Sequence, residues 1–348
     1  MPTYKDLELA RASYKLMHDL IDVKKGESVL ITIDSVADFR VAEELAKAAE
    51  ILGGKVMVAW HSTPKGYGAL TMPYLPEPLI AGAAKTDVWV ELNEQWLLYS
   101  PIWDEAVTNG RTRQIQLGGL GVDRITRCIG DTDITSLKAF QDTLTGMTRA
   151  AHKGRITNEA GTDVSFDISP TRPVTNEINY ATPGVHFLLG QIGWAPVEES
   201  IQGVIAFDGT ISGGGDADLG FLTEPLKYIV QEGRIREIKG GRQADILRAY
   251  YKSLNDDNMY ISAHVCYGVL PNAQLGECTV ENERVWGSTQ WGFGHQGSCF
   301  SGGEPRVAVS HIDGICLNCS VWLDGIQILD KGTYIEPKLA ELAKKLGK

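Results

Sequence analysis

The sequence predicts an α/β domain with a parallel sheet, followed by a mainly antiparallel β domain of the α+β class. In residues 1–150, apolar runs of strand length alternate with helical patterns, which is typical of a parallel sheet flanked by helices. In residues 151–348, short strand-like runs between Gly, Pro, Asn and Asp dominate. The 348 residues suffice for two domains of about 150 residues each. We therefore expect a Rossmann-like domain over 1–150 and a β-rich domain over 151–348.

The first domain is predicted to begin with a helix, because apolar residues recur at helical spacing from Leu7 to Leu20. The next run, Ser28–Ile33 (SVLITI), is rich in β-branched residues, as expected for a strand buried on both faces. The same alternation continues along this part of the chain. Further strands are expected at 55–59, 87–91 and 113–117, and helices at 37–52, 79–84, 102–109 and 134–151.

The second domain is predicted to contain many short strands and two helices. Gly213–Asp216 (GGGD) has the composition of a hairpin turn, and His311–Leu323 forms one long strand-like run. The other strands are expected at 155–157, 163–167, 203–207, 226–230 and 234–239, and the helices at 243–254 and 337–346.

Composition argues against several classes of function. The chain has 33 Lys and Arg residues against 44 Asp and Glu residues, and its net charge of −11 disfavours a nucleic-acid partner, since phosphate backbones are repelled. No apolar run approaches the ~20 residues that cross a bilayer, and the first residues are charged where a signal peptide is apolar. Six scattered cysteines fit reduced thiols. We expect a cytoplasmic enzyme without a membrane partner.

A glycine-rich stretch, Gly118–Gly121 (GGLG), follows a predicted strand as phosphate-binding loops do. No Gly-Lys-Ser/Thr sequence comes after it, so we do not expect a nucleotide site there.

The strongest chemical signal is His311 followed two positions later by Asp313. Residues two apart on a strand share a face, so the imidazole and the carboxylate can point into one space. With a distant histidine, such a pair can form the two-His-one-carboxylate triad that binds Fe(II). His264, in the apolar stretch AHVCYG, is the best third ligand. The pattern alone is equally compatible with an aspartate that orients a buried neutral histidine, and His264 alone with a core histidine.

The order of His264, His311 and Asp313, with the context SAHVCYGVLPNAQ (Ser262–Gln274), resembles the 2,5-dihydroxypyridine 5,6-dioxygenase branch of the thermophilic metallo-aminopeptidase fold. Four segments resemble that fold as a whole. They are GTDVSFDI (Gly161–Ile168), APVEESIQGVIAFDG (Ala195–Gly209), YGVLPNAQ (Tyr267–Gln274) and the stretch from SHIDG to LDG (Ser310–Gly325). The resemblance implies an extradiol-type dioxygenase that opens a hydroxylated pyridine or related aromatic ring with O2. It also implies one non-haem Fe(II) ion in the β-rich domain, held by His264, His311 and Asp313, and a homo-oligomer.

The same resemblance implies substrate residues and exposes departures. Glu177 and His186 occupy positions where the branch places acidic and imidazole groups near the substrate, and Tyr99 stands where it carries a histidine. A phenol with an ordinary pKa of ~10 is a poorer base than imidazole. The identity of the ring substrate is therefore less well predicted than the class of reaction. Tyr99, Glu177 and His186 are therefore the predicted catalytic residues.

Two alternatives remain. The fold also hosts peptidases that hold two metal ions, but Gln191, His264 and Gln290 stand where these carry other metal ligands. Neutral amides do not offset the charge of two cations, so a metal-dependent peptidase or hydrolase is the weaker alternative. A binding module without enzymatic activity is the third possibility, and it predicts no stoichiometric metal.

Overall fold

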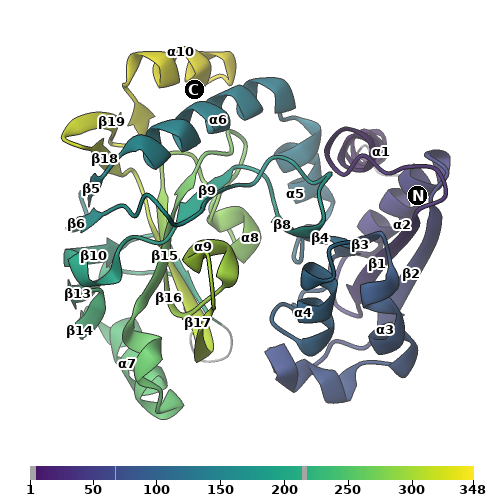
Figure 1. Ribbon diagram of the computed structural model, residues 1–348, viewed down its shortest axis with the longest axis horizontal. Coiled ribbons are helices and arrows are strands. Elements are labelled where there is room, and N and C mark those ends of the chain that lie inside the picture. Colours follow the sequence, from purple (N-terminus) through teal and green to yellow (C-terminus); the bar gives the residue numbers. More distant parts are fainter. Residues whose placement is uncertain (1–4, 67, 214–217) are drawn as a thin grey trace. The chain divides into compact units, whose positions relative to one another are not determined.

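The computed structural model describes residues 5–66, 68–213 and 218–348 (Figure 1). The chain divides into two compact units: unit 1 comprises the described residues of Met1–Thr132 together with Glu177–Leu189, and unit 2 comprises Asp133–Asn176 together with those of Gly190–Lys348. The predicted boundary after residue 150 differs from this division in two places. Helix α6 (Ile134–Ala150) packs on α10 (Pro337–Lys345) in unit 2, and strand β8 (Gly184–Phe187) pairs with a strand of unit 1.

Unit 1 contains a five-stranded sheet in the order β2-β1-β3-β4-β8. All of its pairings are parallel, as the sequence predicts. The strands are β1 (Ser28–Asp34), β2 (Lys55–His61), β3 (Val88–Glu91), β4 (Arg113–Gln116) and β8. The helices are α1 (Asp6–Lys15), α2 (Phe39–Ile51), α3 (Glu77–Gly82), α4 (Pro101–Thr108) and α5 (Val122–Ile125).

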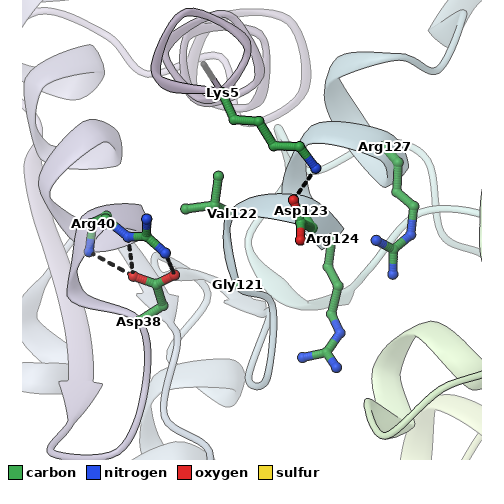
Figure 2. A pocket seen from close by; sticks show the side chains of 8 residues that line it. All are labelled: Lys5, Asp38, Arg40, Gly121, Val122, Asp123, Arg124 and Arg127. Atoms are coloured by element: carbon green, nitrogen blue, oxygen red, sulfur yellow. Dashed lines mark hydrogen bonds and ion pairs between the residues drawn. The ribbon is translucent and has the colours of Figure 1, made fainter. Parts of the chain in front are cut away.

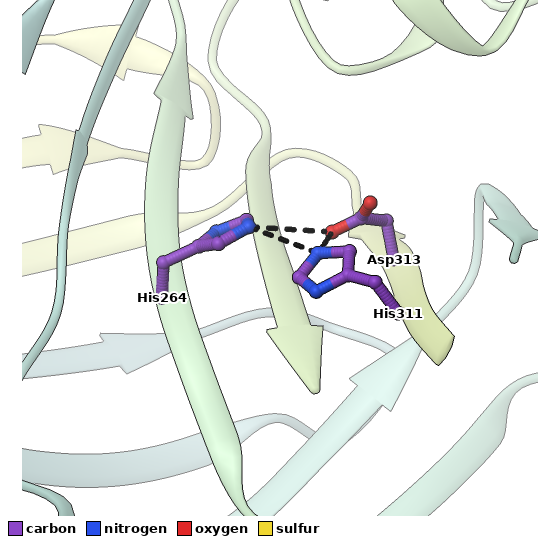
Figure 3. Close-up of side chains that lie close together, drawn as sticks. All are labelled: His264, His311 and Asp313. Carbon is purple, nitrogen blue, oxygen red and sulfur yellow. Dashed lines mark hydrogen bonds and ion pairs between the residues drawn. The ribbon is translucent and has the colours of Figure 1, made fainter. Parts of the chain in front are cut away.

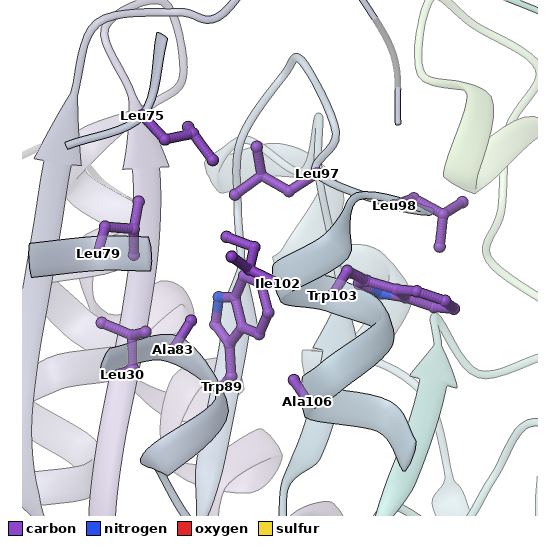
Figure 4. Packing of buried hydrophobic residues seen from close by; sticks show 10 residues of the cluster. All are labelled: Leu30, Leu75, Leu79, Ala83, Trp89, Leu97, Leu98, Ile102, Trp103 and Ala106. Carbon is purple, nitrogen blue, oxygen red and sulfur yellow. The ribbon is translucent and has the colours of Figure 1, made fainter. Parts of the chain in front are cut away.

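Local sequence explains where these helices begin. The Asp38 side chain accepts a hydrogen bond from the backbone N–H of Arg40 and so caps α2. Pro101 occupies the first turn of α4, where its missing N–H costs nothing. One face of the sheet is covered by an apolar cluster in which Trp89 of β3 packs with Ile102 of α4 (Figure 4). The Trp89 indole donates to Thr32 Oγ1 at 2.9 Å, so its polar atom is also satisfied.

A carboxyl group lies fully buried at the end of β3. The side chain of Glu91 accepts hydrogen bonds from the backbone N–H of Leu97 and from Gln114 Nε2, the latter at 3.2 Å. Burial raises the pKa of Glu91 from 4.5 to about 8, although hydrogen bonds from Leu97 and from the amides of Gln116 and Asn93 oppose the shift. Glu91 is therefore a neutral acid near pH 7, and it anchors the loop that leads to Tyr99.

The neutral state of Glu91 predicts a pH-dependent stability. The unfolded carboxyl ionises at 4.5 and the folded one at about 8, so its contribution is complete below pH 4.5 and is lost as the pH rises to about 8. At about 1.4 kcal/mol per pKa unit, the loss approaches about 5 kcal/mol. Glu91→Gln, which cannot ionise, is expected to flatten this slope and to exceed the wild type in stability at pH 8. Urea denaturation of the wild type and Glu91→Gln between pH 5 and 8 measures the slope and the stability at pH 8. If the stability of both proteins changes with pH in the same way, Glu91 is not protonated in the folded state.

Unit 2 contains two sheets in which every pairing between described strands is antiparallel. This agrees with the prediction for the second half of the chain. The first sheet has the order β14-β13-β10-β6-β5-β18-β19-β20, with β5 (Lys153–Thr157), β6 (Asp163–Asp167), β10 (Gln202–Phe207), β13 (Leu226–Gln231), β14 (Arg234–Lys239), β18 (Ser320–Leu323), β19 (Ile326–Asp330) and β20 (Thr333–Tyr334).

The second sheet of unit 2 carries the histidines of interest. Its order is β12-β11-β17-β16-β15-β9-β7, with β7 (Val174–Asn176), β9 (Gln191–Trp194), β11 (Thr210–Ser212), β12 (Gly220–Phe221), β15 (Ser262–Gly268), β16 (Thr289–Gln296) and β17 (Arg306–Cys316). The remaining helices of this unit are α7 (Arg242–Leu254), α8 (Thr279–Asn282) and α9 (Ser298–Ser301).

Two expectations for this half need comment. The run His311–Leu323 is not one strand: β17 ends at Cys316 and β18 begins at Ser320 in the other sheet, because the chain turns at Asn318, whose φ is +46°. The expected hairpin turn at Gly213–Asp216 lies, except for Gly213, outside the described residues. All six cysteines are free thiols. The helices in the described part of the chain are too short or too polar to cross a membrane.

Candidate functional site

Three neighbouring strands bring the predicted metal ligands together. In the register of the sheet, His264 on β15 lies opposite Gly292 on β16, and Gly292 lies opposite Asp313 on β17. His311 precedes Asp313 by two residues on β17 and so shares its face, as the sequence predicts. His264 and Asp313 are thus separated by one strand whose residue between them has no side chain. The side chains of His264 and Asp313 point toward the same space (Figure 3).

The three side chains are in close contact. His311 Nε2 lies 3.0 Å from Asp313 Oδ1, and His264 Nε2 lies 3.6 Å from the same oxygen and 3.1 Å from His311 Nε2. One donor atom from each residue falls within 4.8 Å of the others, and among the described residues this is the one group of three or more His, Cys, Asp or Glu side chains that does so. Such spacing suits convergence on a single ion.

Further contacts orient both imidazoles. The Nδ1–H of His311 donates to the carbonyl oxygen of His295 at 2.6 Å, so Nε2 is the nitrogen that faces the group and that binds a metal once it is deprotonated. His264 stacks on Phe300 at 4.4 Å between ring centroids, and its Nδ1 lies 3.5 Å from Cys266 Sγ. His264 Nε2 therefore also faces the group. Both rings present the nitrogen that a metal requires.

Burial and mutual charge set the protonation of the group. Burial lowers the pKa of His264 to about 3, although Asp313 opposes this, so its imidazole is neutral. Burial also lowers the pKa of His311, but the adjacent Asp313 carboxylate outweighs it and the net shift is upward. Burial raises the pKa of Asp313, but His311 outweighs burial and the net shift is downward. Asp313 is therefore ionised. A bound cation can neutralise its negative charge in place of a proton.

Gly292 makes room for this arrangement. A Cβ atom at residue 292 would lie 2.5 Å from His264 Nε2 and 2.8 Å from His311 Cε1, closer than real contacts allow. Glycine within a strand commonly marks such a close approach. The bare backbone at Gly292, two imidazole nitrogen donors and one carboxylate together fit a divalent first-row transition metal.

Gly292→Ala is therefore expected to weaken metal binding while leaving the sheet intact, since the added methyl group displaces both imidazoles. We expect about a tenfold or greater loss of Co²⁺ affinity, by analogy with changes next to metal ligands. Competition against a chelator measures the affinity. Gly146→Ala on α6, where an added Cβ meets nothing within 4 Å, is the control that should bind Co²⁺ like the wild type. Unchanged affinity in Gly292→Ala contradicts the role of the bare backbone.

The predicted substrate residues lie in unit 1, whereas the metal group lies in unit 2. Glu177 and His186 thus do not belong to the β-rich part of the chain, where the sequence places them, because β8 joins the parallel sheet beside β4. The four-residue run of β8 has no pattern that reveals this pairing. Glu177 Oε2 accepts from the backbone N–H of Phe187 at 3.1 Å, which holds Glu177 near His186 in the same segment.

His186 is arranged as a neutral base. Burial lowers its pKa, although a hydrogen bond to the Thr182 carbonyl opposes the shift. Nε2 lies 2.7 Å from that carbonyl oxygen and donates to it, so the lone pair resides on Nδ1. The ring also packs beside Tyr180, at 5.5 Å between centroids. His186 can therefore accept a proton at Nδ1.

Tyr99 has an unusual backbone. Its φ of +61° lies in the left-handed region, which residues other than glycine rarely adopt. Its ring meets Trp103 edge-on at 5.4 Å, and Leu97, two residues earlier, is held by Glu91. Strained backbone of this kind clusters at functional sites. The backbone alone does not mark Tyr99 as a site residue, however, because other non-glycine residues share this region. In the described part of the chain there are six of these: Asp22, Glu232, Asn255, Asn318, Asp324 and Lys331.

Sequence reasoning missed several residues around the metal group. His295, Cys266 and Phe300 contact the two imidazoles, and Gly292 lies between them. The alternating glycines of WGFGH (Trp291–His295) were a usable signal, since glycine in a strand often marks a close approach.

Unit 1 has a cavity of about 510 Å³ beside the glycine-rich stretch (Figure 2). It is lined by Lys5, Asp38, Arg40, Gly121, Val122, Asp123, Arg124 and Arg127. Two of its cations are paired within the cavity: Arg40 makes a bidentate contact with Asp38, and Lys5 pairs with Asp123. Arg124 and Arg127 leave this lining with more cations than carboxylates, and Arg124 donates to the Gly119 carbonyl at 3.0 Å.

Comparisons with known proteins agree with this picture. The family model described as 2,5-dihydroxypyridine 5,6-dioxygenase matches residues 10–336. The 2,5-dihydroxypyridine 5,6-dioxygenase of Pseudomonas putida is 24% identical over 340 residues, covering 91% of this chain and 93% of the relative.

Solved structures support the same fold. The 2,5-dihydroxypyridine dioxygenase structure from Pseudomonas putida KT2440 superposes with a TM-score of 0.77 at 20% identity, covering 97% of this chain and all of the other. Wild-type AmpT from Thermus thermophilus superposes with a TM-score of 0.67 at 14% identity, covering 95% and 99%. These likenesses confirm the resemblance drawn from the sequence. Because the family model matches nearly the whole chain, this protein belongs to the 2,5-dihydroxypyridine 5,6-dioxygenase family.

Proposed function

We propose that this dioxygenase holds one non-haem Fe(II) ion through His264, His311 and Asp313 and opens the ring of 2,5-dihydroxypyridine or a close hydroxylated analogue. The observation that carries the proposal is the convergence of two imidazole nitrogens and one carboxylate oxygen within 4.8 Å in a chain of this family. Two histidines and one carboxylate bind Fe(II) on one side and leave positions for substrate and O2.

The protein's own contribution is geometric and electrostatic. When bound, Fe(II) would supply the electron transfer between the ring and O2 that no side chain provides. His264 is kept neutral by burial, so its nitrogen is ready to bind. His311 is oriented by the His295 carbonyl, and because Asp313 raises its pKa it gives up its Nε2 proton when the ion binds. Strand β15 is buried throughout and β16 nearly so, whereas His311 and Asp313 on β17 are partly exposed.

For the substrate, we propose the roles that the resemblance implies. His186, neutral and with its lone pair on Nδ1, accepts the proton of a ring hydroxyl, with Tyr99 as the second candidate for this step. Glu177 hydrogen-bonds the ring substituents. The homo-oligomeric state and the cytoplasmic location expected from the sequence stay predictions, to be checked by light scattering and by cell fractionation.

The hydrolase alternative gains no support from the site. Gln191 and Gln290, both buried, are neutral amides that lie beside the metal group, and Glu283 nearby is already paired with Arg284. Two cations would need more negative charge than Asp313 provides. We therefore propose one metal ion rather than two.

The test is metal content together with O2 consumption. Protein purified without oxygen should contain one iron per chain and consume one O2 per 2,5-dihydroxypyridine, with loss of the ring absorbance. A panel of hydroxylated pyridines and benzenes then locates the preferred substrate. Two zinc or cobalt ions per chain with peptide cleavage would favour the hydrolase, and no stoichiometric metal would favour a binding module.

A further inference from the structure

A row of buried polar side chains leads away from Asp313. Gln290 on β16, Gln191 on β9, and the adjoining Glu283 and Arg284 are each at most 7% exposed. Gln290 precedes Gly292 by two residues and so lies on the face of β16 that the metal group occupies. None of these four side chains is a proposed metal ligand. Buried polar groups of this number require an explanation, because each must be satisfied by hydrogen bonds.

The row has a defined direction. The Arg284 guanidinium can only donate, and it pairs with Glu283. Glu283 Oε2 therefore accepts, and Gln191 Nε2 lies 3.4 Å from it. The same Nε2 donates to Gln290 Oε1 at 2.6 Å. Because the carbonyl oxygen of Gln290 is used in this way, its NH₂ group is the part left to donate toward Asp313, which lies on the neighbouring strand β17 two positions along the register.

This order fixes both amides. An isolated glutamine can turn its amide by half a turn and exchange donor for acceptor. Here the pairing with Arg284 makes Glu283 an acceptor at one end of the row, and Asp313 is charged at the other. The reversed orientation is excluded because it would place a carbonyl oxygen of Gln191 against Glu283 and one of Gln290 against Asp313. Gln290 therefore presents a permanent donor to Asp313.

We propose that Gln290 is a positioning residue that holds the Asp313 carboxylate in the orientation that binds the metal, and that Gln191 acts through Gln290. The terminal torsion of an aspartate side chain is broad, so its carboxylate needs an outside contact to select one rotation. His311 and His264 both approach Oδ1, and a fixed donor on the carboxylate keeps that oxygen directed at the site of the ion. Outer hydrogen bonds of this kind are known to tune metal sites. The inference rests on the metal centre proposed above.

Methionine variants test the role of the amides, because methionine matches glutamine in length and lacks its donor and acceptor. The full chain is loaded with Co²⁺, and its affinity is measured by competition with a chelator while the visible absorption of the ion is recorded. Gln290→Met is expected to lower Co²⁺ affinity about 10- to 100-fold and to alter the absorption, since Asp313 loses its fixed orientation. Gln191→Met should cause a smaller loss, because Gln290 is then free to turn.

The double variant shows whether the two act in series. If Gln191 works through Gln290, the double variant binds Co²⁺ as weakly as Gln290→Met alone. Gln116→Met on β4 is the matched control, since Gln116 is an equally buried strand glutamine of unit 1, and it should keep the affinity and absorption of the wild type. Thermal unfolding establishes that each variant is folded. If Gln116→Met and Gln290→Met lose the same stability but only Gln290→Met loses Co²⁺ affinity, the loss of affinity is not caused by destabilisation.

Each outcome decides the inference. Wild-type Co²⁺ affinity and absorption in Gln290→Met overturns it, as does an additive loss in the double variant. Suppose that the wild type binds Co²⁺ through Asp313 with an affinity that Gln290→Met lowers, yet consumes no O2 with any dihydroxypyridine. In that case the proposed function fails and the positioning role stands. If ring cleavage is present and Gln290→Met binds Co²⁺ normally, only the positioning role fails. A wild type that binds no Co²⁺ overturns both.

Discussion

Asp313→Ala is expected to lose both its metal ion and its ring-cleaving activity while it still folds. Asp313 provides the one negative charge of the metal group, and without it two neutral imidazoles face a divalent cation alone. The loss of affinity and turnover should exceed the roughly 100-fold that outer-shell changes can cause. Metal analysis after gel filtration and O2 consumption with 2,5-dihydroxypyridine measure the two effects.

Two controls make this result specific. Asp313→Asn keeps the shape of the side chain without its charge, and it should also bind metal poorly if charge is the essential property. Asp208→Ala removes another carboxylate of unit 2, one that accepts a hydrogen bond from the backbone N–H of Leu317 at 2.7 Å, and it should keep its metal. If Asp313→Ala retains iron and turnover, the assignment of the metal centre is wrong.

Arg284→Met is expected to cause a large loss of stability in the β-rich unit. Arg284 is fully buried, and its guanidinium pairs with the buried Glu283 carboxylate. Removing one partner of a buried ion pair leaves an uncompensated charge and typically costs about 3–5 kcal/mol. Urea denaturation at pH 8 measures the loss. The exposed pair of Lys138 and Asp142 is the contrast, because Lys138→Met should cost less than about 1 kcal/mol.

The pH dependence separates this cause from a loss of packing. Burial raises the pKa of Glu283 to about 7 even though Arg284 opposes the shift, so without Arg284 the carboxyl takes up a proton more readily. The destabilisation should therefore be smaller at pH 5.5 than at pH 8. Adding Glu283→Gln to Arg284→Met should restore much of the lost stability at pH 8. An equal loss at both pH values, unchanged by Glu283→Gln, points to packing instead.

Local patterns were sufficient for much of the architecture. The helices and parallel strands of the first part of the chain occur within a few residues of their predicted ranges, because each is specified by the periodicity of its own apolar residues. The pairing of His311 with Asp313 is equally local, since residues two apart on any strand share a face. The resemblance then supplied the family and the choice of His264.

Long-range pairing was beyond the reach of such patterns. The boundary of the units differs from the prediction because β8 returns to the first sheet after β5, β6 and β7 have entered unit 2, and no feature of its four residues encodes that partner. The run from His311 to Leu323 has the pattern of one strand because its turn at Asn318 lies between apolar stretches that each have strand character.

The sequence by itself determined the parallel and the antiparallel character of the two parts, the main helices and strands of the first part, the face that His311 shares with Asp313, and the family. Only the tertiary structure decided that His264 meets them, that Gly292 leaves the space in which they converge, and that a directed row of amides ends on Asp313. The physical reason is that these contacts depend on the register of separate strands. Register is set by pairing and packing across the whole sheet rather than by the residues of any one strand.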